Sequence, residues 1–157
     1  MTALQHEVHA ACAPEHVWAV LADLEAVQRY NPGVRSAAIE GTQRNGVGAR
    51  RACELIPKGR VVERVTHWEE NQALGLEVAE SDWPIHFMRW VTYLEPSGAG
   101  TRISQSLEYE VKFGPLGWLL DHLVMRSKLQ HAIDAVFASL AKHAEASAAE
   151  KEACHGV

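Results

Sequence analysis

The chain of 157 residues has no excess of basic residues and no long apolar run. Its formal net charge is −5 and its sequence isoelectric point is about 6.0, so we expect no basic face and no nucleic-acid partner. No apolar run approaches the roughly 20 residues that a membrane-spanning helix requires. The opening residues, MTALQHEVHA, lack the basic and then apolar segments of a secretion signal. These absences predict a cytoplasmic protein that does not span a membrane.

The cysteines are too few and too widely separated for a disulfide framework, and the histidines are too poorly spaced for a metal site. Cys12, Cys53 and Cys154 are odd in number and widely separated, so we expect free thiols and no disulfide. His6 and His9 lie three residues apart on a predicted strand, where their side chains point to opposite faces. The sequence also has no nucleophile elbow and no phosphate-binding loop. We therefore predict no metal, no cofactor and no recognisable catalytic signature.

The residues that are present suffice for one folded domain. The hydrophobic fraction is 47 %, and a chain of this length can bury a substantial core. The last residues, EASAAEKEACHGV, are small and polar, which is typical of a frayed terminus. We expect a single domain over residues 1–147, followed by a flexible tail over residues 148–157.

Hydrophobic periodicity predicts the secondary structure. Alternation predicts a strand over residues 4–11, and helical spacing predicts two short helices over residues 14–30, jointed at Asp23. The tripeptide NPG then ends the helical segment. A long helix follows Pro115 and runs to about residue 146; its apolar stripe turns at residues 125–128, where the helix bends or changes neighbour. Strand-like runs separated by turn signals lie over residues 34–40, 47–55, 60–68, 73–80, 85–94 and 102–112.

The last of these runs alternates most clearly between a mostly apolar face and a polar face. The apolar face carries Thr101, Ile103, Gln105, Leu107, Tyr109 and Val111. A sheet with one wet face must cover its other face, and only the C-terminal helix is long enough to do so. We therefore predict an α+β fold in which a curved antiparallel sheet of six to seven strands wraps around the C-terminal helix. Pockets favour such concave places.

Several segments carry a resemblance to a known family. They are APEHVWAVLADLEAVQRYNPGVRSAAIEG, VVERVTHWEENQALGLEV, and YLEPSGAGTRISQSLEYEV leading into FGPLGWLL. Together with the order of elements, they resemble the helix-grip fold of the START-like superfamily, also called SRPBCC. That superfamily includes polyketide cyclases and dehydratases, lipid-transfer proteins, pathogenesis-related plant allergens and plant hormone receptors. The resemblance implies a START-like ligand-binding domain over residues 1–147, and it places YNPGV, with Tyr30, beside the mouth of the pocket. Its members share a cavity rather than one chemistry, so it implies fold more than function.

Two neighbouring strands supply candidate cavity residues. Gln105 interrupts the apolar row, and a buried amide needs partners or bound water, so it either bonds internally or contacts a ligand. Some hormone receptors of the family carry a pocket carboxylate at what looks like this position, which favours the second interpretation. In the preceding strand, pairing of Leu94 near Thr101 would turn His86, Met88, Trp90 and Thr92 inward. The outward face would then carry Phe87, Arg89, Val91 and Tyr93, and this apolar face could form a homodimer contact.

The apolar content of residues 60–68 does not decide which face is buried. The resemblance implies that the Glu of a Glu-Arg-Val triplet points into the cavity, which assigns Glu63 inward and Arg64 outward. His67 shares the face of Glu63 in a regular strand. Arg126 and Gln130 continue the helical stripe of Ile133 and Phe137, and they could meet Glu63 or Gln105 across the cavity.

Three functions fit these patterns. The first is a carrier or sensor that binds a small hydrophobic or amphipathic molecule, as lipid-transport members do. The alternative is a polyketide cyclase/aromatase or dehydratase-like enzyme, in which Glu63, His67 and Arg126 would act as acid and base. The third is an accessory module that binds a partner through the apolar strand face. The predicted ligand contacts are Tyr30, Glu63, His67, His86, Met88, Trp90, Gln105, Leu107, Tyr109, Arg126, Gln130, Ile133 and Phe137.

Overall fold

The computed structural model describes residues 1–155 and confirms the predicted order of elements. The N-terminal half contains β1 (Thr2–Ala10), α1 (Pro14–Ala22), the 3₁₀ helix η1 (Leu24–Arg29), β2 (Val34–Glu40), β3 (Arg50–Leu55) and β4 (Arg60–Glu69). The C-terminal half contains β5 (Ala73–Ser81), β6 (Ile85–Ser97), β7 (Gly100–Val111), α2 (Gly114–Leu120), the π-helical turn η2 (Asp121–Met125) and α3 (Arg126–His155).

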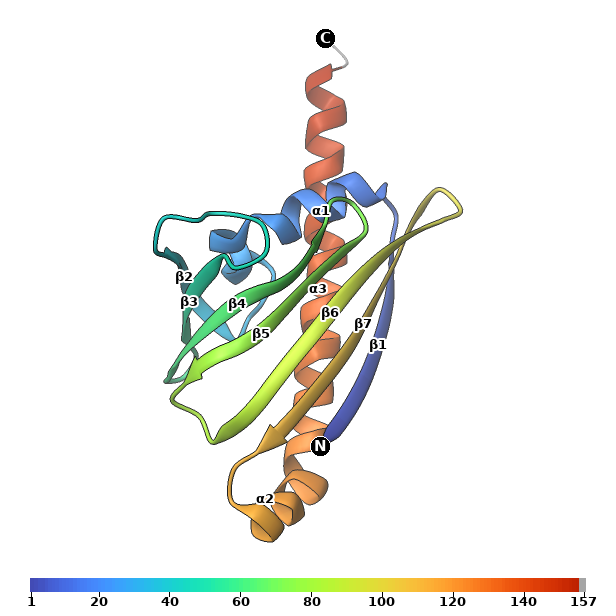
Figure 1. The fold of residues 1–157 in the computed structure, drawn as a ribbon. Coiled ribbons are helices and arrows are strands. Elements are labelled where there is room, and N and C mark those ends of the chain that lie inside the picture. Colours follow the sequence, from blue (N-terminus) through green and yellow to red (C-terminus); the bar gives the residue numbers. More distant parts are fainter. Residues whose placement is uncertain (156–157) are drawn as a thin grey trace.

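The strands form one antiparallel sheet in the order β1-β7-β6-β5-β4-β3-β2. The sheet curves around α3, while α1 lies beside the upper part of that helix (Figure 1) and η1 packs against β2. This arrangement is the predicted α+β helix-grip fold, with seven strands. None of the described helices combines the length and the apolar character needed to cross a membrane.

The first helical segment ends where the sequence predicts. Pro14 occupies the first turn of α1, where a missing N–H costs nothing, and Glu15 in the same turn favours the positive end of the helix dipole. The helix stops at Asp23, whose ψ of 85° is not helical, and η1 follows and ends at Arg29. Asn31 then accepts a 2.9 Å hydrogen bond from the backbone N–H of Gly33, which closes the turn into β2. The predicted joint at Asp23 is confirmed.

The β6–β7 hairpin is longer than expected, although its buried face is as predicted. Leu94 pairs with Ile103, and Pro96 pairs with Thr101, so the predicted pairing of Leu94 near Thr101 was wrong by two residues. A shift by an even number keeps every side chain on its own face. Thr92 and Leu94 are therefore buried beside Ile103, as the alternation requires.

The long helix differs from expectation at its C-terminal end. The change in the apolar stripe, predicted at residues 125–128, begins at the last residue of η2, the π turn that joins α2 to α3. α3 then continues to His155 instead of ending near residue 146, and Ala148 is buried. Hydrophobic periodicity does not reveal this extension, because small residues such as Ala contribute little to an apolar stripe although they favour helix strongly. The last two residues of the expected tail lie outside the described residues, and its flexibility stays a prediction.

Candidate functional site

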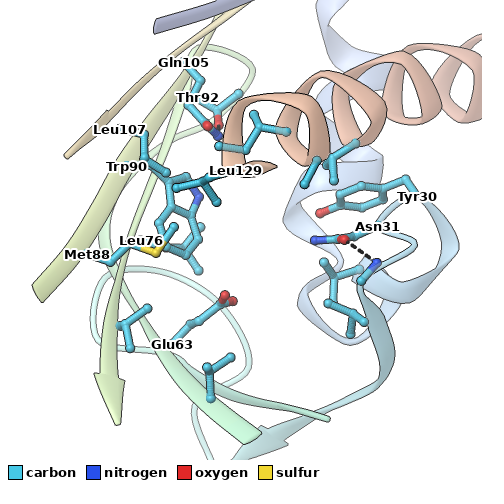
Figure 2. Close-up of a pocket in the computed structure, with 18 of the residues that line it drawn as sticks. Tyr30, Asn31, Glu63, Leu76, Met88, Trp90, Thr92, Gln105, Leu107 and Leu129 are labelled. Carbon is cyan, nitrogen blue, oxygen red and sulfur yellow. Dashed lines mark hydrogen bonds between the residues drawn. The ribbon is translucent and has the colours of Figure 1, made fainter. Parts of the chain in front are cut away.

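A cavity of about 260 Å³ lies between the concave face of the sheet and α3. Its wall is mostly apolar and is built by strands β3 to β7 on one side and by α3 and the η1–β2 junction on the other. The predicted contacts that line it are Tyr30, Glu63, Met88, Trp90, Gln105, Leu107, Ile133 and Phe137. Figure 2 shows Trp90 and Leu107 on the sheet side, with Tyr30 and Asn31 facing them from the other side.

Two predicted contacts on the strands lie outside this cavity because bulges change the alternation. The pairing of β4 with β5 shifts between Val65 and His67, so His67 faces outward and lies 3.2 Å from a carboxylate oxygen of Glu69. Trp68 turns inward in its place and packs edge-on against Trp18. The pairing of β6 with β7 shifts between Ile85 and Phe87, and Ile85 lines the cavity while His86 is exposed outside it.

The other predicted contacts that lie outside the cavity belong to β7 and α3. Tyr109 is on the buried face, but it lies beyond the cavity, where its hydroxyl donates a 2.5 Å hydrogen bond to Asp121. Burial and then the neighbouring Asp121 raise the pKa of Tyr109. Arg126 and Gln130 are exposed, because the face of α3 toward the sheet is centred on Leu129 and its neighbours one turn on. The structure therefore does not bring Glu63, His67 and Arg126 together.

Arg51 is the functional candidate that the sequence analysis missed. Its side chain is 5 % exposed, and its Nε donates a 2.6 Å hydrogen bond to Oε2 of Glu63, which is 13 % exposed. The two residues pair directly across β3 and β4. Glu63 thus points into the cavity, as Figure 2 shows, but Arg51 is its partner in place of Arg126 or Gln130. The signal that could have found Arg51 is the need of a buried carboxylate for a nearby cation.

The environment of this ion pair keeps Arg51 charged and the neighbouring Tyr30 protonated. Burial lowers the pKa of Arg51, but the Glu63 carboxylate, Tyr30 and Cys53 together outweigh burial and hold that pKa above its ordinary value. Burial also raises the pKa of Tyr30, and the charge of Arg51 offsets this only in part. The Tyr30 hydroxyl therefore remains a donor at neutral pH. One end of the cavity presents a neutralised ion pair, a phenol and the side-chain amide of Asn31.

A second polar group lies on the β6–β7 side of the cavity. The side-chain amide of Gln105 donates a 3.1 Å hydrogen bond to Oγ1 of Thr92 on the paired strand. Both residues line the cavity. The amide is thus satisfied within the protein, and its carbonyl oxygen remains an acceptor that a ligand can reach.

The thiols provide a first prediction. Burial and then the Glu63 charge raise the pKa of Cys53 to about 12, and burial also raises the pKa of Cys12. Cys154 is exposed. We expect iodoacetamide at about pH 8 to alkylate only Cys154 in the native protein and all three thiols after unfolding, because the thiolate is the reactive form. Intact-mass measurement checks this, and rapid modification of Cys53 in the native protein would contradict the buried position of β3.

Comparison with known proteins places the chain in a family. The family model described as polyketide cyclase / dehydrase and lipid transport matches residues 1–145, which confirms the START-like resemblance. The crystal structure of TTHA0849 from Thermus thermophilus is similar, with a TM-score of 0.78 at 22 % identity over 93 % of this chain and 99 % of that one. Ara h 8.0201 has a TM-score of 0.71 at 14 % identity over 91 % and 97 % of the two chains. No curated protein matches the sequence significantly. At such identities the two structures support the fold alone, whereas the family model spans nearly the whole chain: the protein belongs to the polyketide cyclase / dehydrase and lipid transport family.

Proposed function

We propose that the protein binds a small hydrophobic molecule carrying an uncharged polar group, as a carrier or sensor. The observation that supports this most is the composition of the cavity wall, which is apolar except for hydrogen-bonding groups at its edges. Ligand sites typically combine an apolar lining with a few placed polar groups. Family membership favours the same function.

The volume of the cavity limits the size of the ligand. A dry apolar cavity of about 150 Å³ holds one benzene ring. The cavity of about 260 Å³ therefore suits a molecule of one or two fused rings, or an equivalent aliphatic body. The indole of Trp90 and the side chains of Leu76, Met88 and Leu107 surround that body on the sheet side (Figure 2).

The charge at the polar end favours an uncharged head group. Arg51 is already neutralised by Glu63, so an anionic ligand would lose its hydration without gaining an unpaired cation. A hydroxyl or carbonyl group can instead bond to the Tyr30 phenol, the Asn31 amide or the free edge of the Glu63 carboxylate. We expect a neutral polar group to bind better than either a carboxylate or no polar group at all.

Three bicyclic probes test this proposal: 2-naphthol, naphthalene and 2-naphthoate. Each is titrated while the emission of Trp90 is followed, with Trp90→Phe as the control for the other tryptophans. We expect one site for 2-naphthol and an affinity roughly fivefold higher than that of naphthalene, because one net hydrogen bond contributes about 1 kcal/mol. If 2-naphthoate bound most tightly, the predicted preference for an uncharged head group would be wrong. If none of the three probes bound, the cavity would not be a site for bicyclic aromatic ligands.

The cyclase or dehydratase alternative has less support. Of its three candidate acid and base residues, only Glu63 lines the cavity, and its carboxylate is held in the pair with Arg51. General acid–base catalysis requires its groups within hydrogen-bond reach of one substrate.

The homodimer through β6 stays a prediction: Tyr93 is exposed on that face, but the guanidinium of Arg89 covers the ring of Phe87.

A further inference from the structure

The segment that joins β7 to α3 exposes an unusual amount of apolar surface. Its exposed large apolar side chains, hereafter the α2 patch, are Phe113, Leu116, Trp118, Leu119, Leu120, Leu123, Val124 and Met125. Leu116 is 65 % exposed and Leu123 is 70 % exposed. In Figure 1, α2 lies beyond the end of the sheet, opposite the C-terminal end of α3. Contiguous apolar patches of this kind mark interaction sites.

The orientation of α2 is fixed by contacts that turn its polar side inward. A Cβ atom on Gly117 would lie 2.2 Å from the backbone oxygen of Lys112, so the helix abuts the end of β7 at a position that only glycine fits. Asp121, four residues on, is buried and accepts hydrogen bonds from Tyr109 at 2.5 Å and from Thr2 at 2.8 Å. Residues four apart share one helical face. The face toward the protein is therefore small and polar, and the leucines and Trp118 face outward.

The charges around the α2 patch decide which partner fits it. Lys112, Arg126 and Lys128 are exposed around the patch, and none of them forms an ion pair within residues 1–155. Residues 111–133 contain one carboxylate, the buried Asp121, and the exposed Glu110 lines a hollow together with Phe113 and Trp118. The patch therefore has three exposed cations and one exposed carboxylate near it, although the whole chain carries a net charge of −5. On the sheet the pattern is the opposite, because each of the following arginines pairs with a glutamate: Arg50, Arg51, Arg60, Arg64, Arg89 and Arg102.

We propose that the α2 patch docks onto an anionic lipid surface, with its leucines and Trp118 in the interfacial region and the three cations against the head groups. Helices with an apolar face, aromatic residues and flanking cations bind in the plane of such surfaces. A second copy of the chain is less suitable, because packing two patches together brings two sets of unpaired cations into contact. Docking of this kind does not depend on the cavity ligand, so it is tested independently of the proposed function.

Vesicle flotation tests this proposal with the full chain. The vesicles are phosphatidylcholine alone or phosphatidylcholine with phosphatidylserine, at low and at high salt. We expect binding to the mixed vesicles, weakened by salt and much reduced without phosphatidylserine. Lys128→Gln should weaken binding roughly fivefold, since a cation near an anionic surface contributes about that factor. Leu116→Ser with Leu123→Ser should weaken it by about tenfold or more, since burying leucine side chains drives insertion.

Matched controls lie elsewhere on the surface. Val47→Ser removes an apolar side chain that is 61 % exposed on the β2–β3 loop, and Lys142→Gln removes an exposed cation of α3. Both should bind vesicles like the wild type. In the wild type, brominated lipid should also quench the emission of Trp118, and this quenching should disappear in Trp118→Phe. The proposal would be overturned if the wild type did not bind vesicles, or if the control variants lost as much binding as the patch variants. It would also be overturned if the wild type bound no vesicles but sedimented as a dimer that the double leucine variant converts to a monomer.

Discussion

Replacing Arg51 by methionine is expected to lower the free energy of unfolding by about 3–5 kcal/mol, because the substitution leaves the Glu63 carboxylate buried without its cation. The pair is among the most deeply buried ion pairs of the sheet, with a 2.6 Å Nε–Oε2 distance. Urea denaturation at neutral pH measures this loss.

Two variants control this experiment. Arg102→Met breaks an exposed pair with Glu95 on the same sheet and should cost no more than about 1 kcal/mol. Arg51→Met with Glu63→Leu removes both charges and should recover most of the stability, since well-packed apolar residues replace buried ion pairs at little cost. An Arg51→Met variant as stable as Arg102→Met would show that water in the cavity solvates Glu63, and it would remove the structural role assigned to the pair.

Filling the cavity from α3 is expected to abolish ligand binding. Val136 lines the cavity and is half-buried, and a tryptophan at this position would occupy much of the 260 Å³. We expect Val136→Trp to weaken 2-naphthol binding by roughly a hundredfold or more, because the ligand's apolar contacts, worth about 1.5–3 kcal/mol for each buried side-chain equivalent, are lost.

The control for the filling variant is on the same helix. Ala135 is exposed and does not line the cavity, so Ala135→Trp adds an indole without entering the site. It should bind 2-naphthol like the wild type, while the melting temperatures of both variants stay close to that of the wild type. Unchanged 2-naphthol affinity in Val136→Trp would mean that the ligand binds elsewhere, and the proposed function would then fail at this cavity.

The fold was accessible from the sequence because its signals are repeated along the chain. The alternation in β7 and the helical stripe of α3 each identify a buried face, and the Asn31 turn marks the end of the helical segment. A hairpin register wrong by two residues did no harm, because strand alternation has period two. A register error of an even number of residues leaves the predicted buried face of a strand unchanged.

The site was less accessible because single residues decide it. The bulges before His67 and at His86 each insert one residue into a strand, and this reverses the face of the residues beyond. Nothing in the local sequence signals them. Arg51 was missed for a related reason: its neighbour Arg50 also pairs with glutamate on the outer side, and the sequence does not show which of the two arginines is buried.

The most direct test of the central claim is the set of nuclear Overhauser effects between 2-naphthol and the methyl groups of the protein. If the cavity between the sheet and α3 is the ligand site, the naphthol protons should contact the methyl groups of Leu76, Leu107 and Ile133, which all line it. Contacts restricted to Leu116 and Leu123 of the α2 patch, or no contacts at saturating 2-naphthol, would contradict the account.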